Sequence, residues 1–176
     1  MIESFNTIKK EARAQFKDRN SRFIGLVFPV KSEEDVKQIQ QDLRKEFYDA
    51  RHHCYAYILG SEKAIFRAND DGEPSGSAGK PIYNQLLSAD VTNVLAVVVR
   101  YFGGTKLGVP GLINAYKTAT KMAIDEAGIL KQYNASKIEL TFPYENINIA
   151  MQATSKDFVK IISQEFEMTC KMEVHV

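Results

Sequence analysis

Six consecutive apolar residues, VLAVVV at positions 94–99, constrain the fold of this chain more than any other segment. A strand that is apolar on both faces is normally central in its sheet and covered on both sides. Glycine-rich loops precede and follow it, at residues 70–80 and 103–111. Glycine lets another molecule approach the backbone closely, so these two loops indicate a recognition surface beside a buried strand, and we expect them to lie close together.

The composition is that of a globular protein of one domain or two small ones. The chain has 176 residues, of which 44% are apolar and 26% charged, and its net charge is +1. This total favours neither a nucleic acid nor an acidic partner, although a local basic patch is compatible with it. No signal peptide and no apolar run of about 18 residues is present, so we expect a cytoplasmic protein without a membrane span. Cys54 and Cys170 are expected to be reduced thiols.

The segments before residue 68 predict a strand, a helix and a hairpin. Residues 22–30 indicate a strand, and Ser32 with Asp35 makes a capping-box pattern at the start of a helix. The apolar stripe of that helix is Val36, Ile39, Leu43 and Phe47. Residues 53–59 and 64–67 then indicate a hairpin that turns at Gly60 and Ser61.

The segments after the first loop predict two helices around the apolar strand, and then a second unit. Residues 80–87 indicate a short helix with Pro81 in its first turn, and a helix of about 17 residues is expected from Pro110 to a stop at Gly128. Its buried stripe is Leu112, Tyr116, Ala119 and Ala123. After a linker at 130–135, the pattern predicts a strand at 137–142, a helix at 146–164 and a strand at 168–176. Such a β-α-β piece is small to hold its own core, so we expect it to dock on the first unit or to belong to a longer sequence.

Neither glycine-rich loop fits a nucleotide-binding motif. Lys80 follows Gly79, but Pro81 stands where a P-loop has Ser or Thr, and Pro74 stands where its first glycine belongs. Gly103, Gly104 and Gly108 do not make G-x-G-x-x-G. We therefore expect no ATP hydrolysis that depends on Lys80. The sequence is compatible with two interpretations of the helix start near Pro110. It could bind an anion together with Lys106, or its glycines could only form a tight turn.

The first loop also allows a metal hypothesis. Asp70, Asp71 and Glu73 could hold Mg²⁺, or they could belong to a solvated acidic loop that turns at Asp70-Asp71-Gly72. Alternatively, Glu73 could pair with Arg67 or Arg100 and fix the loop. His52 and Cys54 share one face of a strand, while His53 points away. Two ligands are too few for a structural zinc site, so Cys54 is expected in the core rather than as a ligand or a nucleophile.

Cationic and aromatic residues near the strand ends suggest contact with a phosphate backbone and stacking on bases, although Tyr101 and Phe102 could instead pack in the sheet. The candidate binding residues are Arg51, His52, Asp71, Glu73, Ser75, Ser77, Lys80, Arg100, Gly103, Gly104 and Lys106. We predict no catalytic residue, resident metal or cofactor.

Four stretches carry a resemblance to a known family. They are SRFIG at 21–25, RHHCYAY at 51–57, RANDDGEPSGSAGKP at 67–81 and NVLAVVVRYFGGTKLGVPGL at 93–112. With these the chain resembles the IMPACT/YigZ family of uncharacterised and translation-linked proteins. Family members usually have Thr-Gly where this chain has Val-Pro at 109–110, which affects the expected shape of the second loop.

The resemblance implies an α+β fold in two domains. Residues 1–130 would be similar to domain IV of elongation factor G, with helices on a mixed four-stranded sheet and a left-handed βαβ crossover. Residues 136–176 would be similar to part of its ferredoxin-like domain V. Both of these domains of elongation factor G work on the ribosome, so the resemblance implies contact with RNA or the ribosome. Eukaryotic members bind the activator of a starvation-responsive kinase, a role that would not extend to bacteria, which lack that pathway.

Two functional hypotheses follow. The first is a non-enzymatic cytosolic binding protein linked to translation or its regulation, which contacts RNA, the ribosome or a protein partner. No signal specific for DNA or a membrane is present. The second is a small metal-assisted enzyme that acts on a phosphorylated substrate through the Asp70-Asp71-Glu73 loop. The sequence favours the first hypothesis, because neither a nucleophile-base pair nor a complete metal set can be assembled.

Overall fold

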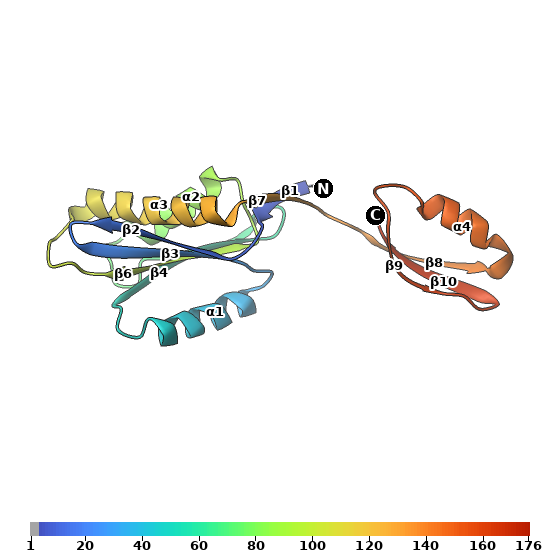
Figure 1. The fold of residues 1–176 in the computed structure, drawn as a ribbon, viewed down its shortest axis with the longest axis horizontal. Helices are drawn as coiled ribbons and strands as arrows, with labels where there is room; N and C mark the ends of the chain where they lie inside the picture. Colours follow the sequence, from blue (N-terminus) through green and yellow to red (C-terminus); the bar gives the residue numbers. More distant parts are fainter. Residues whose placement is uncertain (1–3) are drawn as a thin grey trace. The chain divides into compact units, whose positions relative to one another are not determined.

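The computed structural model describes residues 4–176 and divides into two compact units (Figure 1). Unit 1 runs to Tyr133, and unit 2 is Asn134–Val176. Both contain helices and strands, which confirms the predicted α+β class. Among residues 4–176, no helix combines the length and apolar character that crossing a membrane requires.

Unit 1 is built on a five-stranded antiparallel sheet with the order β2-β3-β6-β4-β5. The strands are β2 (Ala12–Asp18), β3 (Ser21–Pro29), β4 (His52–Leu59), β5 (Ile65–Asn69) and β6 (Val94–Tyr101). The expected mixed four-stranded sheet is wrong on both counts. The pattern of β2 is weak, because two of its three inward residues are alanines. Strands β3 and β4 run parallel to each other, but β6 separates them and pairs antiparallel with both. The handedness of their connection stays a prediction.

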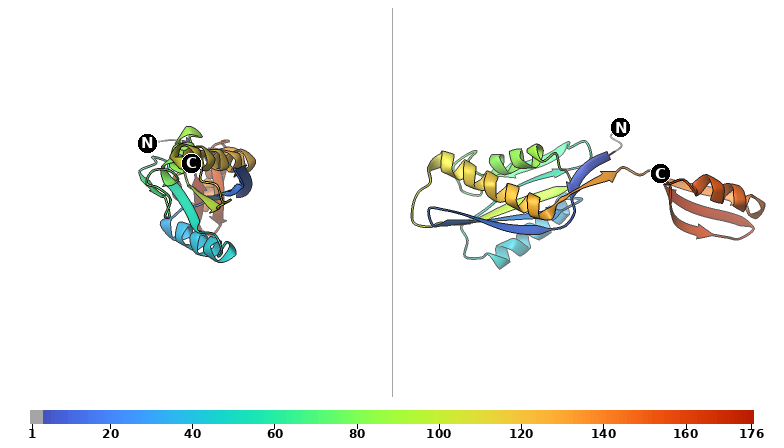
Figure 2. Two further views of the ribbon diagram at one scale, coloured as in Figure 1. Left: turned by 90° about the vertical axis from the view of Figure 1, so that its left-hand side faces the viewer. Right: turned by 45° about the horizontal axis from the view of Figure 1, so that its top comes forward.

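Helices cover both faces of this sheet (Figures 1 and 2). Helix α1 (Glu33–Glu46) packs on one face, and α2 (Gly79–Ser88) and α3 (Gly108–Ala127) pack on the other. Residues 94–100 of β6 are all buried, which confirms that the VLAVVV strand is central. Its alternate side chains enter the two different core clusters, as expected for a strand covered on both sides.

The helix boundaries in unit 1 largely match the sequence signals. The Ser32 hydroxyl accepts a hydrogen bond from Asp35 N at 3.2 Å, and the Asp35 carboxylate accepts one from Ser32 N at 3.1 Å. Helix α3 begins at Gly108, two residues before Pro110, and Gly128 ends it with a φ of 69°. A Cβ on Gly25 of β3 would lie 2.3 Å from the carbonyl oxygen of Ala119, so α3 packs directly on the backbone of the sheet.

A two-stranded ribbon joins the start of the described chain to the end of unit 1. Strand β1 (Ser4–Ile8) pairs antiparallel with β7 (Ile129–Tyr133), and Ser4 lies opposite Tyr133. The predicted linker at 130–135 is therefore wrong over most of its length. All five residues of β7 are exposed, so no apolar pattern marks the strand, and its partner lies at the opposite end of the sequence.

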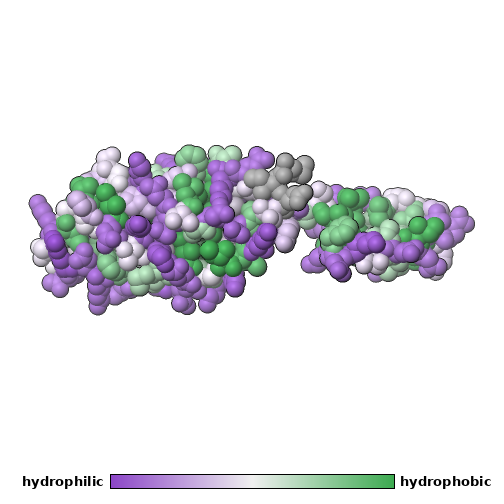
Figure 3. Space-filling view, turned by 90° about the horizontal axis from the view of Figure 1, so that it is seen from above, coloured by the Kyte–Doolittle hydropathy of each residue, from purple (hydrophilic) through white to green (hydrophobic). Residues whose placement is uncertain are grey.

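Unit 2 is a three-stranded antiparallel sheet with one α-helix and a 3₁₀ turn. It comprises β8 (Lys137–Pro143), η1 (Tyr144–Asn146), α4 (Ile147–Thr154), β9 (Lys160–Glu165) and β10 (Thr169–His175), with the strand order β8-β10-β9. The predicted helix at 146–164 is wrong, because α4 ends at Thr154 and residues 160–165 form a strand. Hydrophobic residues lie on the surface of this unit (Figure 3), including Ile149, Phe158 and Met168 among those that are exposed. Its assignment as ferredoxin-like stays a prediction.

Candidate functional site

A cavity of about 900 Å³ in unit 1 brings the two glycine-rich loops together. Its lining residues are Asp49, Arg51, His52, Glu73, Pro74, Arg100, Tyr101, Phe102, Lys106, Leu107, Gly108, Val109 and Leu112. Glu73 and Pro74 come from the first loop, and residues 106–108 come from the second. The prediction that the loops lie on one face is therefore confirmed. The sheet register contributes as well, because His52 of β4 lies opposite Arg100 of β6.

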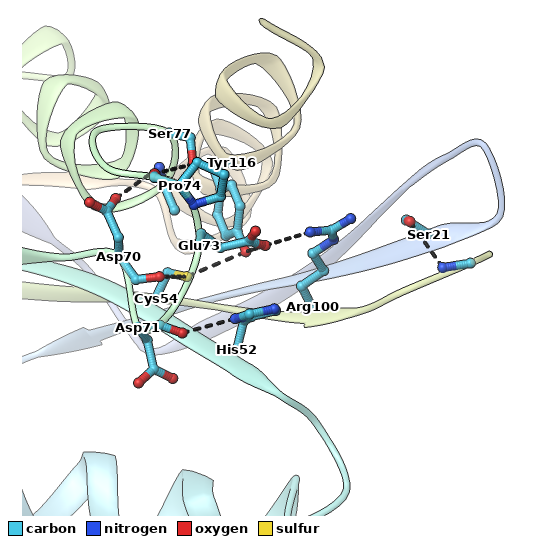
Figure 4. A network of polar contacts seen from close by, with 12 residues as sticks. Ser21, His52, Cys54, Asp70, Asp71, Glu73, Pro74, Ser77, Arg100 and Tyr116 are labelled. Atoms are coloured by element: carbon cyan, nitrogen blue, oxygen red, sulfur yellow. Dashed lines mark hydrogen bonds and ion pairs between the residues drawn. The ribbon is translucent and has the colours of Figure 1, made fainter. Parts of the chain in front are cut away.

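A buried polar network forms one wall of this cavity (Figure 4). Arg100 donates a hydrogen bond to the Glu73 carboxylate at 2.7 Å, and the Tyr116 hydroxyl donates to the same oxygen, also at 2.7 Å. Of the two partners that the sequence allowed for Glu73, the structure selects Arg100. Arg67 is exposed on β5 and makes no ion pair among the described residues.

Cys54 extends this network into the core. Its Sγ lies 3.3 Å from the Tyr116 hydroxyl and 3.0 Å from the carbonyl oxygen of Asp70. Burial raises the pKa of the Cys54 thiol and also that of the Tyr116 hydroxyl. A thiol held in its neutral form is a poor nucleophile, and the core position expected for Cys54 is confirmed.

The acidic residues of the first loop hold the loop in shape. Asp70 accepts hydrogen bonds from the backbone N–H groups of Gly76, Ala78 and Gly79, at 2.8 to 3.0 Å, and thereby caps the start of α2. Asp71 accepts from Arg44 at 3.0 Å and from the backbone of His53 at 2.7 Å. The three carboxylates thus serve different partners. Among residues 4–176, no group of three or more His, Cys, Asp or Glu side chains is arranged to hold a metal ion.

The exposed cations of the cavity are Arg51 and Lys106. Both are solvent-exposed, whereas Arg100 is 7% exposed and is neutralised by Glu73. Phe102 is 57% exposed, and the Arg100 guanidinium lies 5.5 Å from the centre of its ring. The first turn of α3 contains no acidic residue, and Gly108 at its start lines the cavity. The cavity therefore presents two exposed cations, the positive end of a helix and the exposed ring of Phe102.

The remaining candidate residues do not line this cavity. The Ser77 hydroxyl is buried and donates to Pro74 O at 2.6 Å, and Ser75 is exposed. Lys80 lies beside a separate hollow between α2 and α3, together with Lys117. Gly103 is positioned by the β2–β3 turn, where an added Cβ would lie 2.0 Å from the backbone of Asn20.

Besides Tyr101 and Phe102, six lining residues were absent from the sequence prediction as site residues: Asp49, Pro74, Leu107, Gly108, Val109 and Leu112. Val109 and Leu112 lie near the start of α3, close in sequence to Lys106, which could have indicated the site. The predicted apolar stripe assigned Leu112 to the core and did not include Val109. Asp49 accepts a hydrogen bond from the Tyr101 hydroxyl at 2.8 Å. No sequence signal marks Asp49, because it lies between α1 and β4, more than 50 residues from its partner.

Comparisons with known proteins identify the family of this chain. The model of the Impact N-terminal domain matches residues 19–124. The chain is 37% identical to the IMPACT family member YvyE of Bacillus subtilis over 75% of this chain and 61% of that protein. It is 32% identical to the IMPACT family member YigZ of Escherichia coli over 85% of this chain and 74% of that protein. The chain belongs to the IMPACT family, as its motifs indicated.

A solved structure shares the fold of this chain. A crystal structure of a hypothetical protein aligns over all of this chain and 86% of its own, with a TM-score of 0.75 and 29% identity. The two-domain translational regulator Yih1 aligns over 70% of this chain with a TM-score of 0.41, which is too low to support an argument. The chain matches less than two thirds of the length of YvyE.

Proposed function

We propose that this protein is a binding protein that acts in translation or its regulation, and that the cavity between the glycine-rich loops binds RNA. The observation that carries the proposal is the position of Arg51 and Lys106 on the same cavity as the exposed ring of Phe102. Cations that contact phosphates provide affinity independent of sequence, and an exposed aromatic ring accepts an unpaired base by stacking.

The buried network supports this role by fixing the geometry of the wall. Because Glu73 neutralises Arg100, that guanidinium holds the first loop and lies against the Phe102 ring rather than contacting a phosphate. The start of α3 adds backbone N–H groups at Gly108 and Val109. A single-stranded segment with one phosphate near Lys106 and one base on Phe102 fits these groups best.

A protein partner is the second candidate. Phe102 and Val109 are both large apolar residues at the cavity, 57% and 46% exposed. Aromatic side chains and arginine are enriched in protein–protein interfaces, which favours Phe102 beside Arg51 as a contact surface. The metal-assisted enzyme is supported less, because Asp70, Asp71 and Glu73 already serve separate partners.

The test is a titration of single-stranded and structured RNA at two salt concentrations. Lys106→Ala should weaken binding and reduce the slope of log affinity against log salt by roughly 0.7 to 1, as expected for the loss of one phosphate contact. Lys80→Ala is the matched control, because Lys80 is an exposed lysine outside the cavity. Phe102→Ala should weaken the binding of single-stranded RNA by about 1–3 kcal/mol, which is the contribution of one stacked base.

Two outcomes would contradict the proposal. One is the absence of RNA binding at low salt, which would favour the protein partner. The other is an equal loss of affinity in Lys106→Ala and Lys80→Ala, because a diffuse positive charge rather than this cavity would then account for binding.

A further inference from the structure

The five-stranded sheet of unit 1 has two edges, and they differ in how they are protected. At one edge, α3 packs along β2, and Arg13 and Lys17 of that strand are exposed charges. Arg13 also donates to Glu46 at 2.7 Å. Charges and a covering helix are the usual means by which proteins prevent pairing at an edge strand. The edge at β2 is therefore closed to an added strand.

Strand β5 forms the other edge, where α2 packs on one face of the strand and no further strand is paired. Its five residues are all exposed or half-exposed, and it pairs on one side only, with β4. In an antiparallel pair, alternate residues direct their N–H and C=O groups away from the partner strand. No backbone hydrogen bond from the described turns, loops or caps involves residues 65–69. Gly79 of α2 packs on the backbone of Asn69, so the outward N–H and C=O groups that stay without a described partner are those within residues 65–68.

Arg67 is the single charged side chain of β5; Ile65, Phe66 and Ala68 are apolar and Asn69 is polar. Ile65 is 53% and Phe66 56% exposed, and the Phe66 ring stacks on Tyr83 of α2 with centroids 5.0 Å apart. Leu87, one helical turn after Tyr83, is also exposed. Arg67 lies at the middle of β5, opposite Tyr57 of β4, and makes neither an ion pair nor a side-chain hydrogen bond among the described residues.

We propose that β5 accepts an extended segment of a partner protein as a sixth strand, with an acidic residue opposite Arg67 and apolar neighbours against Phe66. Main-chain hydrogen bonds supply affinity in this mode, and alternate side chains supply specificity. A second copy of this chain fits less well, because centred antiparallel pairing of two β5 strands places Arg67 against Arg67, and like charges in that position repel. This surface is separate from the cavity, so the proposal does not depend on RNA binding.

The test uses two short acetylated and amidated peptides, STVEVTS and STVKVTS. The wild-type protein should prefer the glutamate peptide, and that peptide should slow hydrogen exchange of the β5 amides. Arg67→Glu should reverse the preference, with a change of about threefold to tenfold for each peptide, the range expected when a cross-strand charge pair becomes repulsive. Arg67→Gln should bind both peptides alike. Because Arg67 is exposed, both variants should fold, which circular dichroism would check.

Three results would overturn the proposal. The first is the absence of both binding and amide protection at about 1 mM peptide, the weak end of the affinity range. The second is a peptide preference that Arg67→Glu leaves unchanged. The third is self-association of the wild-type protein that Arg67→Glu abolishes or strengthens, because β5 would then pair with a second copy.

Discussion

The Arg100 guanidinium and the Glu73 carboxylate meet at 2.7 Å, and their side chains are only 8% and 3% exposed. Because the Tyr116 hydroxyl donates to the same carboxylate oxygen, one acidic side chain ties the first loop to the central strand and to α3. Breaking a buried ion pair leaves an uncompensated charge, which costs more than the intact pair contributes.

Glu73→Ala should therefore destabilise unit 1 strongly. The expected loss is about 3–5 kcal/mol in the free energy of unfolding, because the buried guanidinium of Arg100 would lose its counter-charge. Urea denaturation followed by circular dichroism measures it. Glu62→Ala, at an exposed position in the β4–β5 turn, is the control and should change stability by less than about 0.5 kcal/mol. A loss of less than about 1 kcal/mol in the unfolding free energy of Glu73→Ala would contradict the prediction. It would mean that water hydrates the Arg100 guanidinium in the variant.

Asp70→Ala should destabilise the start of α2. Three backbone N–H groups would lose their acceptor, and the expected cost is about 2 kcal/mol, the upper value for loss of a helix cap. Hydrogen exchange of the Gly76, Ala78 and Gly79 amides should accelerate in the variant. Adding Mg²⁺ should stabilise neither protein, because Asp70 acts on the backbone; a rise in wild-type melting temperature with Mg²⁺ would restore the metal hypothesis.

The Cys54 thiol should react slowly in the folded protein. Burial raises its pKa, so the thiolate that attacks alkylating reagents is scarce even at pH 9. Alkylation with iodoacetamide, followed by peptide mass mapping, should show at least about a hundredfold slower labelling than in urea. Mapping separates Cys54 from Cys170, which is also buried. Rapid labelling of Cys54 alone under native conditions would reveal local opening of the cavity wall.

His53 should make stability fall as the solution is acidified. Burial, and then the nearby Arg44, lower the pKa of His53 below its ordinary value of 6.5. The unfolded chain therefore binds this proton first. The contribution is complete above pH 6.5 and decreases below it by at most about 1.4 kcal/mol per pH unit. The unfolding free energy of His53→Gln should decline less between pH 7 and pH 5 than that of the wild type. His52→Gln is the matched control, and equal declines in all three proteins would contradict the prediction.

Gly25 and Gly60 should resist substitution for different reasons. In Gly25→Ala, the new methyl group would overlap the Ala119 carbonyl, so α3 must move and stability should fall by about 3 kcal/mol, the upper value for overpacking. Gly60 has open space around it but a φ of 81°, so Gly60→Ala should cost about 1–2 kcal/mol through backbone strain alone. Thermal denaturation measures both variants. A loss in Gly25→Ala no larger than that in Gly60→Ala would contradict the prediction, because α3 would then move aside at a smaller cost than overpacking implies.

Unit 1 could be predicted well wherever local signals were strong. The capping box at Ser32, the proline in the first turn of α2 and the doubly apolar strand β6 each gave the correct element. The signals were weak where burial is slight. Strand β7 is exposed throughout, and its pairing with β1 depends on residues more than 120 positions away. In unit 2, Phe158, Ile161 and Ile162 fitted a helical period, but pairing with β10 places residues 160–165 in a strand.

The sequence indicated which loops surround the cavity. It did not indicate which partners the charged side chains of these loops would have. Arg51, His52 and Lys106 do line the cavity, because loop position follows from strand order. Arg100 was expected either to bind a phosphate or to pair with Glu73, and the fold of the first loop over β6 produces the pair. The capping role of Asp70 depends likewise on the loop geometry, which charge patterns alone do not specify.

The pairing of Ser4 with Tyr133 has a practical consequence. The two ends of unit 1 lie beside each other (Figure 1). The chain therefore enters and leaves the five-stranded sheet and its three helices at neighbouring positions. A module with adjacent ends can be inserted into a host loop or circularly permuted without spanning a distance. Residue 133 could be joined to residue 4 through a short glycine linker, and the chain opened in the β4–β5 turn. We expect this circularly permuted unit 1 to fold with the cavity intact and to tolerate insertion into a host loop.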